Sequence, residues 1–394
     1  MTKHVAIDGA CWWNDRGFGR FTRELVRALA ARTSESGFQY TLFLERENPS
    51  AGLFPDPPSQ VRVEIVDTPS SGASMSGAGA RTPLHMLKMG RALAAARPDL
   101  IFFPAIYSWV PVPSRAPSIV TIHDAIPERF PRLIFPTRTN ELLWRAKSKA
   151  SRALSSRVLT VSKASAREIT ELLGVPPNRI DITSEAADAI FRRRDPVSRS
   201  ETLVKVGLED GPFLLYVGGF NAHKNVLVLL EAFASLEAPI RLVLVGDTSG
   251  KGFHDDIPAI RRWIDTRPEL ANRVALPGWL TDDELVNLYS TASALLMPSL
   301  SEGFGLPAIE AMSCGCPVIC SNRTSLPEVV GDAGLLVEPT DSAAIARAVR
   351  SVLTDKTLAK NLRAAGQARA ATFTWERGAR LTEVSFHAAL QGRT

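Results

Sequence analysis

The sequence predicts an α/β protein of two similar halves, each a parallel sheet with helices on both faces. Short apolar strands alternate with helical patterns along the chain, and this alternation is typical of parallel sheets. The cycle restarts in the middle of the chain, at Phe213 to Val217. In addition, 394 residues are too many for one comfortable hydrophobic core, so a division into about two domains is expected.

The predicted strands are β-branched or apolar runs bounded by turn residues. In the first half they lie at His4 to Ile7, Tyr40 to Leu44, Val61 to Val66, Leu100 to Phe103, Ser118 to Ile122 and Arg157 to Val161. In the second half they lie at Phe213 to Val217, Arg241 to Val245, Val274 to Leu276, Ala294 to Met297, Pro317 to Cys320 and Leu335 to Val337.

The segment Ser184 to Ser200 separates the two halves, because it contains Arg192-Arg193-Arg194-Asp195-Pro196 and lacks apolar periodicity. We therefore expect one domain at 1–185 and a second at 186–375. The Ser-, Gly- and Ala-rich stretch Thr68 to Thr82 cannot bury much apolar area, so it is expected to be a mobile loop.

The end of the chain predicts a helix over 376–394 that packs back on the first domain. Thr374 suits the N-cap of this helix. Its apolar positions are Trp375, Leu381, Val384 and Phe386. The start of the chain has too short an apolar run for a secretion signal, and no later run approaches the ~20 residues of a membrane span. A cytoplasmic location is therefore expected.

The four cysteines do not form a disulfide framework in a chain of this length, which agrees with a reducing compartment. Cys314, Cys316 and Cys320 are expected in the core, because a strand between them would point alternate thiols to opposite faces. Asp282-Asp283 is interpreted as a capping pattern after Thr281, and His254-Asp255-Asp256 as a polar loop. No Asp-x-Asp ends a strand, so no metal site is predicted.

The composition is that of an ordinary globular protein, with 45% hydrophobic and 22% charged residues. The net charge of +5 favours phosphate-bearing ligands or an anionic membrane surface. Part of this charge lies in the helical stretch Arg138 to Arg157, where basic residues accompany Leu142, Leu143 and Trp144. This stretch is either a solvated basic face or a membrane-docking face.

The stretch Ser301 to Glu310 follows a predicted strand and opens a helix, with Pro307 suiting its first position and Gly315 the position past its end. Glu302 is therefore expected on the rim of the sheet and Glu310 on the helix. Carboxylates accept hydrogen bonds from sugar hydroxyls, while glycine amides approach a sugar or phosphate closely. A capping carboxylate before an ordinary helix would show the same pattern.

His123 and Lys224 follow predicted strands at the carboxyl edge, where open α/β sheets bind ligands. A lone histidine at a strand end is also common as a structural residue. Lys224 precedes an apolar helix whose dipole disfavours a cation there, which favours a functional role. Gly17 and Gly19 precede a helix expected to begin near Phe21, so their amides could face a diphosphate; a tight turn is the other interpretation.

Together these motifs resemble those of glycosyltransferase family 4, whose Glu-x7-Glu signature corresponds to Glu302 and Glu310. The other matching segments, in the expected order, are Asp8-Gly9 with Gly17-Phe18-Gly19-Arg20-Phe21, Val120-Thr121-Ile122-His123-Asp124, Tyr216-Val217-Gly218 with His223-Lys224-Asn225, Leu244-Val245-Gly246, and Leu326 to Gly334. The resemblance spans nearly the whole chain. It implies a GT-B fold of two facing Rossmann-like doubly wound domains with a cleft between them.

The resemblance also implies a retaining, metal-independent hexosyltransferase that needs no cofactor and uses a nucleotide-diphosphate sugar. The implied catalytic residues are Glu302, His123 and Lys224. The implied donor-binding residues are Gly17, Gly19, Lys224, Asn225, Gly303, Phe304, Gly305, Leu306 and Glu310. Glu310 would bind the ribose hydroxyls, and Lys224 would stabilise the leaving diphosphate. The first domain would bind the acceptor, near Thr68 to Thr82 and the glycine loop.

One position departs from the family pattern, because many relatives carry an arginine where this chain has Gly219. A second cation for the diphosphate must then come from elsewhere or be absent. The stretch from His123 to Pro127, followed by Phe130-Pro131, is similar to that of members acting on mannose-type donors such as GDP-mannose in polysaccharide, lipopolysaccharide or glycoconjugate biosynthesis.

The expected partners are the nucleotide-sugar donor and a saccharide or lipid-linked acceptor, with no nucleic acid. Peripheral contact with the inner face of the cytoplasmic membrane remains open. Three alternatives also stay open at this point. They are a sugar-nucleotide epimerase on the same fold, a phosphorylase, and a non-catalytic nucleotide-sugar-binding subunit, which the glycine at position 219 would permit.

Overall fold

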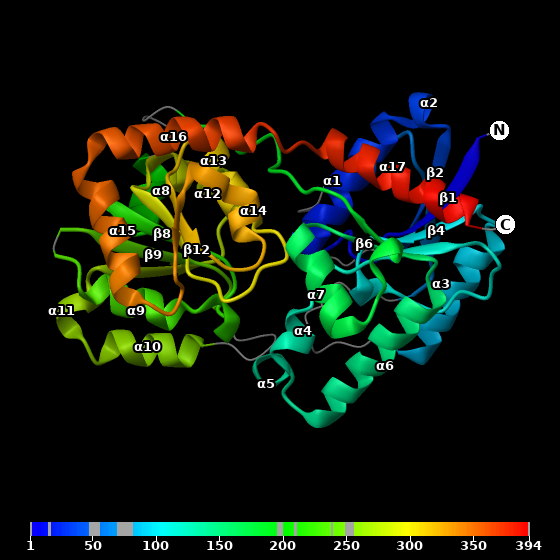
Figure 1. Ribbon diagram of the computed structural model, residues 1–394, viewed down its shortest axis with the longest axis horizontal. Helices are drawn as coiled ribbons and strands as arrows, with labels where there is room; N and C mark the ends of the chain where they lie inside the picture. The colour runs from blue at the N-terminus through cyan, green and yellow to red at the C-terminus, as the bar shows by residue number, and fades with distance from the viewer. Residues whose placement is uncertain are drawn as a thin grey trace. The chain divides into compact units, whose positions relative to one another are not determined.

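The computed structural model describes residues 2–14, 17–46, 56–68, 82–194, 200–208, 211–237, 239–248 and 256–392. The chain forms two compact units (Figure 1). Unit 1 comprises Met1–Pro131, Phe135–Glu185 and Thr374–Thr394, and unit 2 comprises Arg132–Ile134 and Ala186–Phe373. Residues 69–81 of the predicted mobile loop and 195–199 of the predicted hinge lie outside the described residues.

Unit 1 is built on a seven-stranded parallel sheet with the order β3-β2-β1-β4-β5-β6-β7. Its strands are β1 (Lys3–Asp8), β2 (Phe38–Glu45), β3 (Arg62–Val66), β4 (Leu100–Phe103), β5 (Ser118–Thr121), β6 (Arg157–Thr160) and β7 (Ile180–Ile182). The order reverses between β1 and β4, and such a switch point opens a ligand-binding crevice at the carboxyl ends of the strands. The residues of β4 are all buried, as expected for a strand covered on both faces.

The helices between the strands of the first sheet are α1 (Gly17–Ala31), α2 (Thr33–Ser36), α3 (Pro83–Ala95), α4 (Ile126–Arg129), α5 (Pro131–Ile134), α6 (Arg138–Leu154) and α7 (Lys163–Leu173), with 3-10 turns at Ile106–Ser108 and Pro177–Arg179. On α6, Leu142 and Leu143 are exposed. In the described part of the chain, no helix combines the length and the apolar character that crossing a membrane requires.

The last helix of the chain, α17 (Trp375–Gln391), belongs to unit 1 and lies beside α1 (Figure 1). Thr374 caps it by accepting a hydrogen bond from the Arg377 amide, as predicted. Its Glu383 lies 3.1 Å from the guanidinium of Arg32 in a largely buried ion pair. Phe386 is fully buried, but Val384 is exposed, so the prediction for Val384 was wrong.

Unit 2 holds a six-stranded parallel sheet with the order β10-β9-β8-β11-β12-β13. Its strands are β8 (Phe213–Val217), β9 (Arg241–Val245), β10 (Val274–Gly278), β11 (Ala294–Met297), β12 (Val318–Ser321) and β13 (Leu335–Val337). Its helices are α8 (Ser200–Lys205), α9 (Val226–Ala234), α10 (Ile257–Asp265), α11 (Pro268–Ala271), α12 (Asp282–Thr291), α13 (Leu306–Ser313), α14 (Leu326–Val330), α15 (Ser342–Thr354) and α16 (Lys356–Ala370), with 3-10 turns at Ala222–Lys224 and Gly331–Ala333.

The predicted fold class is confirmed, because each unit carries a parallel sheet with alternating helices. Sequence periodicity missed β7, a three-residue strand in which no residue is fully buried. Helix α1 begins at Gly17, several residues before the predicted start near Phe21. All four cysteines are buried and none forms a disulfide, and for Cys314, Cys316 and Cys320 the burial agrees with the predicted place in the core. The capping pattern predicted after Thr281 is present, and the structure shows that it is a capping box completed by Glu284.

Candidate active site

The candidate site of unit 2 lies at the carboxyl edge of its sheet. Lys224 belongs to the turn between β8 and α9, and Glu302 belongs to the loop between β11 and α13. Strands β8 and β11 are neighbours in the sheet, so the loops that leave them meet at the same edge. This is the edge at which open α/β sheets bind ligands.

Lys224 and Glu302 form a tight ion pair. The Lys224 ammonium donates hydrogen bonds to both oxygens of the Glu302 carboxylate, at 2.7 and 2.8 Å. The side chains are only 21% and 10% exposed, respectively. Burial alone would raise the pKa of Glu302, but the charge and hydrogen bonds of Lys224, with a hydrogen bond from Ser299, outweigh it and lower that pKa. The carboxylate is therefore ionised across the physiological range.

Asn225 holds the Lys224 turn in place. Its backbone adopts a left-handed conformation with φ of 61°, which asparagine tolerates better than most residues. Its side-chain amide donates to the carbonyl oxygens of Pro298 and Pro339, at 3.1 and 2.6 Å. These bonds tie the turn to the ends of two other strands. Asn225 therefore fixes the position of the turn that carries Lys224. Its contact with a donor stays a prediction.

The loop Gly303 to Leu306 offers backbone groups rather than side chains. Phe304 is buried, with its ring edge-on to Phe373 at 5.6 Å between centroids. Gly305 has φ of 112°, and a Cβ there would lie 2.7 Å from a methyl carbon of Leu326, so glycine is required at this position. Leu306 opens α13. Donor binding by this loop would therefore use main-chain amides at a helix start.

Glu310 lies on α13 and is 5% exposed. The hydroxyl of Tyr289, a fully buried residue of α12, lies 3.2 Å from one oxygen of this carboxylate. Burial, together with the Glu310 charge, raises the pKa of Tyr289 well above its ordinary value. The phenol therefore remains protonated and donates to Glu310, which fixes the orientation of the carboxylate.

The candidate site residue of unit 1 is His123, which follows β5. Both of its ring nitrogens are buried and have no hydrogen-bond partner within the described residues. Its Nε2 lies 4.0 Å from a carboxylate oxygen of Glu185, and Phe21 packs against the ring with centroids 4.7 Å apart. Burial lowers the pKa of His123 to about 4, so the imidazole is neutral at pH 7. Asp124 caps the next turn by accepting from the Ile126 amide.

The two glycines of the β1–α1 connection differ in environment. Gly17 is exposed at the first position of α1, whereas Gly19 is buried inside the first turn. A Cβ on Gly19 would lie 2.1 Å from the carbonyl oxygen of Asn14. Close packing of the helix on this loop therefore explains Gly19 by itself, and diphosphate binding by both glycines stays a prediction.

The structure joins Lys224 to Glu302, and Tyr289 to Glu310, in unit 2. In unit 1 it places a carboxylate oxygen of Glu185 4.0 Å from His123 Nε2, without a hydrogen bond between them. That the residues of unit 2 and His123 of unit 1 act on one ligand stays a prediction. Sequence reasoning missed Tyr289, Ser299 and Glu185. Glu185 follows the strand β7 that periodicity failed to reveal, and Tyr289 carries no sequence signal because its partner lies on another helix.

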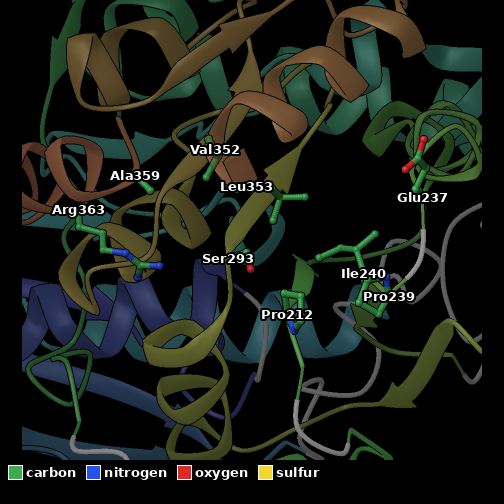
Figure 2. A pocket seen from close by; sticks show the side chains of 9 residues that line it. All are labelled: Pro212, Glu237, Pro239, Ile240, Ser293, Val352, Leu353, Ala359 and Arg363. Atoms are coloured by element: carbon green, nitrogen blue, oxygen red, sulfur yellow. The ribbon is translucent and has the colours of Figure 1, made fainter. Parts of the chain in front are cut away.

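A cavity of about 380 Å³ lies elsewhere in unit 2 (Figure 2). Pro212, Ile240 and Ser293 line it, and each directly precedes a strand of the sheet. The cavity is therefore at the amino edge, opposite the edge that carries Lys224 and Glu302, and we do not assign it to the same site. Within the described ranges, no cluster of His, Cys, Asp or Glu has the arrangement of a metal site.

Known structures share the fold over the whole chain. Sucrose-phosphate synthase from Thermosynechococcus elongatus superposes with a TM-score of 0.76 and 21% identity, covering 99% of this chain and 100% of that one. The Anabaena protein HepE in complex with UDP and glucose gives a TM-score of 0.71 at 18% identity, covering 98% and 100%. The fold is therefore the GT-B fold.

Two family models match the sequence. The model for Glycosyltransferase Family 4 covers residues 16–189, and that for Glycosyl transferases group 1 covers residues 198–369. O-antigen chain mannosyltransferase B of Escherichia coli is 38% identical over 226 residues, which are 56% of this chain and 57% of that protein. D-inositol 3-phosphate glycosyltransferase of Rhodococcus erythropolis is 32% identical over 57% of this chain and 52% of its own length.

The matched segment thus spans about half the length of these curated relatives. The family models, which between them match most of both units, agree with the fold and with the Glu302 and Glu310 signature. The chain belongs to glycosyltransferase family 4.

Proposed function

We propose that this protein transfers a hexose from a nucleotide-diphosphate sugar to a hydroxyl acceptor with retention of anomeric configuration. The proposed donor is mannose-type, such as GDP-mannose, and the proposed setting is the assembly of polysaccharide, lipopolysaccharide or a related glycoconjugate. The mannosyltransferase and inositol-phosphate glycosyltransferase names of the relatives support this proposal. The observation that carries it is the buried Lys224–Glu302 pair at the carboxyl edge of unit 2.

The pair fits the charge changes of the proposed reaction. The bond between the anomeric carbon and the diphosphate oxygen breaks, and a bond from the acceptor oxygen to that carbon forms on the same face. The acceptor proton passes to the leaving phosphate oxygen. Negative charge grows on this phosphate, and the fixed ammonium of Lys224 stabilises it by several kcal/mol, on the order typical of preorganised charge. Glu302 holds the ammonium and accepts hydrogen bonds from the sugar.

The other proposed contacts follow from the local geometry. Glu310, oriented by Tyr289, accepts hydrogen bonds from the ribose hydroxyls. The amides from Gly303 to Leu306 bind the sugar or diphosphate at the start of α13. His123, neutral because of its burial, donates to or accepts from the sugar without adding charge. We propose that no divalent cation or cofactor takes part.

The proposed function is tested by a thermal-shift screen of UDP-, GDP- and dTDP-sugars. GDP-mannose is expected to raise Tm most, because a ligand that binds only the folded state stabilises it. The selected donor should then release free sugar slowly without an acceptor, and EDTA should leave that rate unchanged. Tight binding without any release would indicate a binding subunit instead of a transferase. A rate lost in EDTA and restored by Mg²⁺ would contradict the metal-independent mechanism.

The exposed face of α6 supports a second part of the proposal, a peripheral contact with an anionic membrane. Leu142 and Leu143 are 67% and 63% exposed, and Arg138, Arg145 and Lys149 are exposed on the same helix. Apolar side chains among basic ones suit the interface of acidic lipids. Substituting both leucines by Ser should reduce co-sedimentation with phosphatidylglycerol vesicles but not the Tm. Equal sedimentation of both proteins would show a solvated basic face.

A further inference from the structure

The loop that follows β12 contains a strained residue. Thr324 has φ of 52°, in the left-handed region. A β-branched side chain is disfavoured there, because its Cβ substituents crowd the backbone. Such strain persists only where the surroundings fix it, and it is concentrated at functional sites.

The hydroxyl of Thr324 bonds to the backbone of the residue that carries the candidate carboxylate. Its Oγ1 accepts a hydrogen bond from the Glu302 amide at 3.0 Å. The left-handed backbone thus brings a side-chain acceptor to an amide of a different loop. The sequence gives no sign of this contact, because the two residues are 22 positions apart.

The next two residues hold the same loop from the same side. Ser325 is fully buried, and its hydroxyl lies 2.9 Å from the Glu302 carbonyl oxygen and 2.8 Å from that of Phe304, so it shares its hydrogen between the two. Leu326 packs against Gly305 so closely that a Cβ there would lie 2.7 Å away. The segment Thr324 to Leu326 therefore fixes the backbone of the Glu302 loop at both its amide and its carbonyl groups.

We propose that Thr324 and Ser325 are positioning residues that hold the Glu302 loop so that its carboxylate stays on the Lys224 ammonium. This inference rests on the function proposed above for that pair. We call Thr324 and Ser325 together the clamp. When the diphosphate binds the Lys224 ammonium, the clamp keeps the Glu302 carboxylate from shifting with the ammonium or with the sugar. The carboxylate is therefore in place before the reaction begins. Neither residue is expected to contact the reacting atoms.

The test compares Thr324→Gly with Thr324→Ser. Serine removes only the branching methyl group and glycine removes the whole side chain, and only the serine variant keeps the hydroxyl that accepts from the Glu302 amide. We expect Thr324→Gly to lower kcat about tenfold, with the donor KM changed less than about threefold, because one fixing hydrogen bond is lost. Thr324→Ser should retain kcat within about twofold, and both variants should melt close to the parent Tm.

Hydrogen–deuterium exchange gives a readout that does not depend on turnover. The peptide containing the Glu302 amide should exchange faster in Thr324→Gly than in Thr324→Ser or the parent protein, while the core strand β11 stays protected. Equal exchange in the two variants would overturn the clamp even if the protein showed no transferase activity. Faster exchange with unchanged kcat in an active enzyme would overturn its positioning role. Failure of the parent to turn over any donor would count against the proposed function alone.

Discussion

The carboxyl edges of the two sheets carry carboxylates in contrasting electrostatic settings. In unit 1, Glu185 lies 4.0 Å from a neutral, buried imidazole of His123 with no hydrogen bond between them. In unit 2, Glu302 accepts two hydrogen bonds from the Lys224 ammonium. The carboxyl edge of the sheet thus places a carboxylate beside a neutral imidazole in unit 1 and on an ammonium in unit 2. The comparison shows that the fold supplies the position, and that individual side chains supply the chemistry.

The largest expected effect comes from neutralising the two carboxylates in turn. Glu302→Gln should lower kcat by about 10²- to 10³-fold, as removal of a preorganised charge does, with nucleotide affinity changed less than about threefold. Glu185→Gln should lower kcat only a few-fold, by about 1 kcal/mol at most, because the imidazole that Glu185 faces is neutral. Steady-state kinetics on the donor found in the screen provides the measurement.

Glu310→Ala is the variant to compare with Glu302→Gln. It removes the carboxylate proposed to bind the ribose hydroxyls and leaves the Lys224–Glu302 ion pair intact. The Kd for the free nucleoside diphosphate should rise about tenfold or more, as expected for a lost charge-assisted hydrogen bond. Calorimetric titration of both variants would separate the two roles. Similar losses of affinity and turnover in both would refute the division of labour.

A moderate effect is expected on the pH dependence of stability. Burial lowers the pKa of His123 to about 4, and burial followed by the charge of Lys224 lowers that of His223 to about 4. Below a pH of about 6.5, the ordinary pKa of histidine, these imidazoles bind protons in the unfolded chain but not in the folded chain. The unfolding free energy should therefore fall as the pH drops from about 6.5 toward 4, by up to about 1.4 kcal/mol per pH unit for each histidine.

Urea denaturation at several pH values would measure this slope in His123→Gln and His223→Gln, with His387→Gln on the exposed side of α17 as the matched control. Each of the first two substitutions should flatten the slope, and the control should leave it unchanged. A slope that both buried substitutions leave intact would mean that neither imidazole is excluded from protonation in the folded state.

The smallest expected effect comes from adding a cation to the charged edge. Gly219 has a backbone conformation open to other residues, and a Cβ there meets only the side-chain oxygen of Asn221, at 3.0 Å. Gly219→Arg should tighten binding of the free nucleoside diphosphate about three- to tenfold, because an arginine can bind phosphate bidentately. Gly219→Ala is the control for the change in backbone. Unchanged affinity in Gly219→Arg would mean that the diphosphate lies out of its reach.

Much of the candidate site could be located from the sequence, because short local patterns place residues at strand ends. The strand before Lys224 and the strand before Glu302 were both predicted with the bounds that the structure has. Residues that act through another element carry no such pattern. Tyr289 meets Glu310 across two helices, and Thr324 meets Glu302 across two loops. A left-handed φ at a threonine cannot be anticipated, because threonine has no preference for it.

The sequence by itself determined the alternation of strands and helices, the two parallel sheets, and the strand-end positions of His123, Lys224 and Glu302, because periodicity and turn residues act locally. Only the tertiary structure decided that Lys224 and Glu302 pair while the His123 nitrogens remain without a hydrogen bond from the described residues. Burial and partners from distant loops set these states, since desolvation and hydrogen bonding depend on what packs around a group.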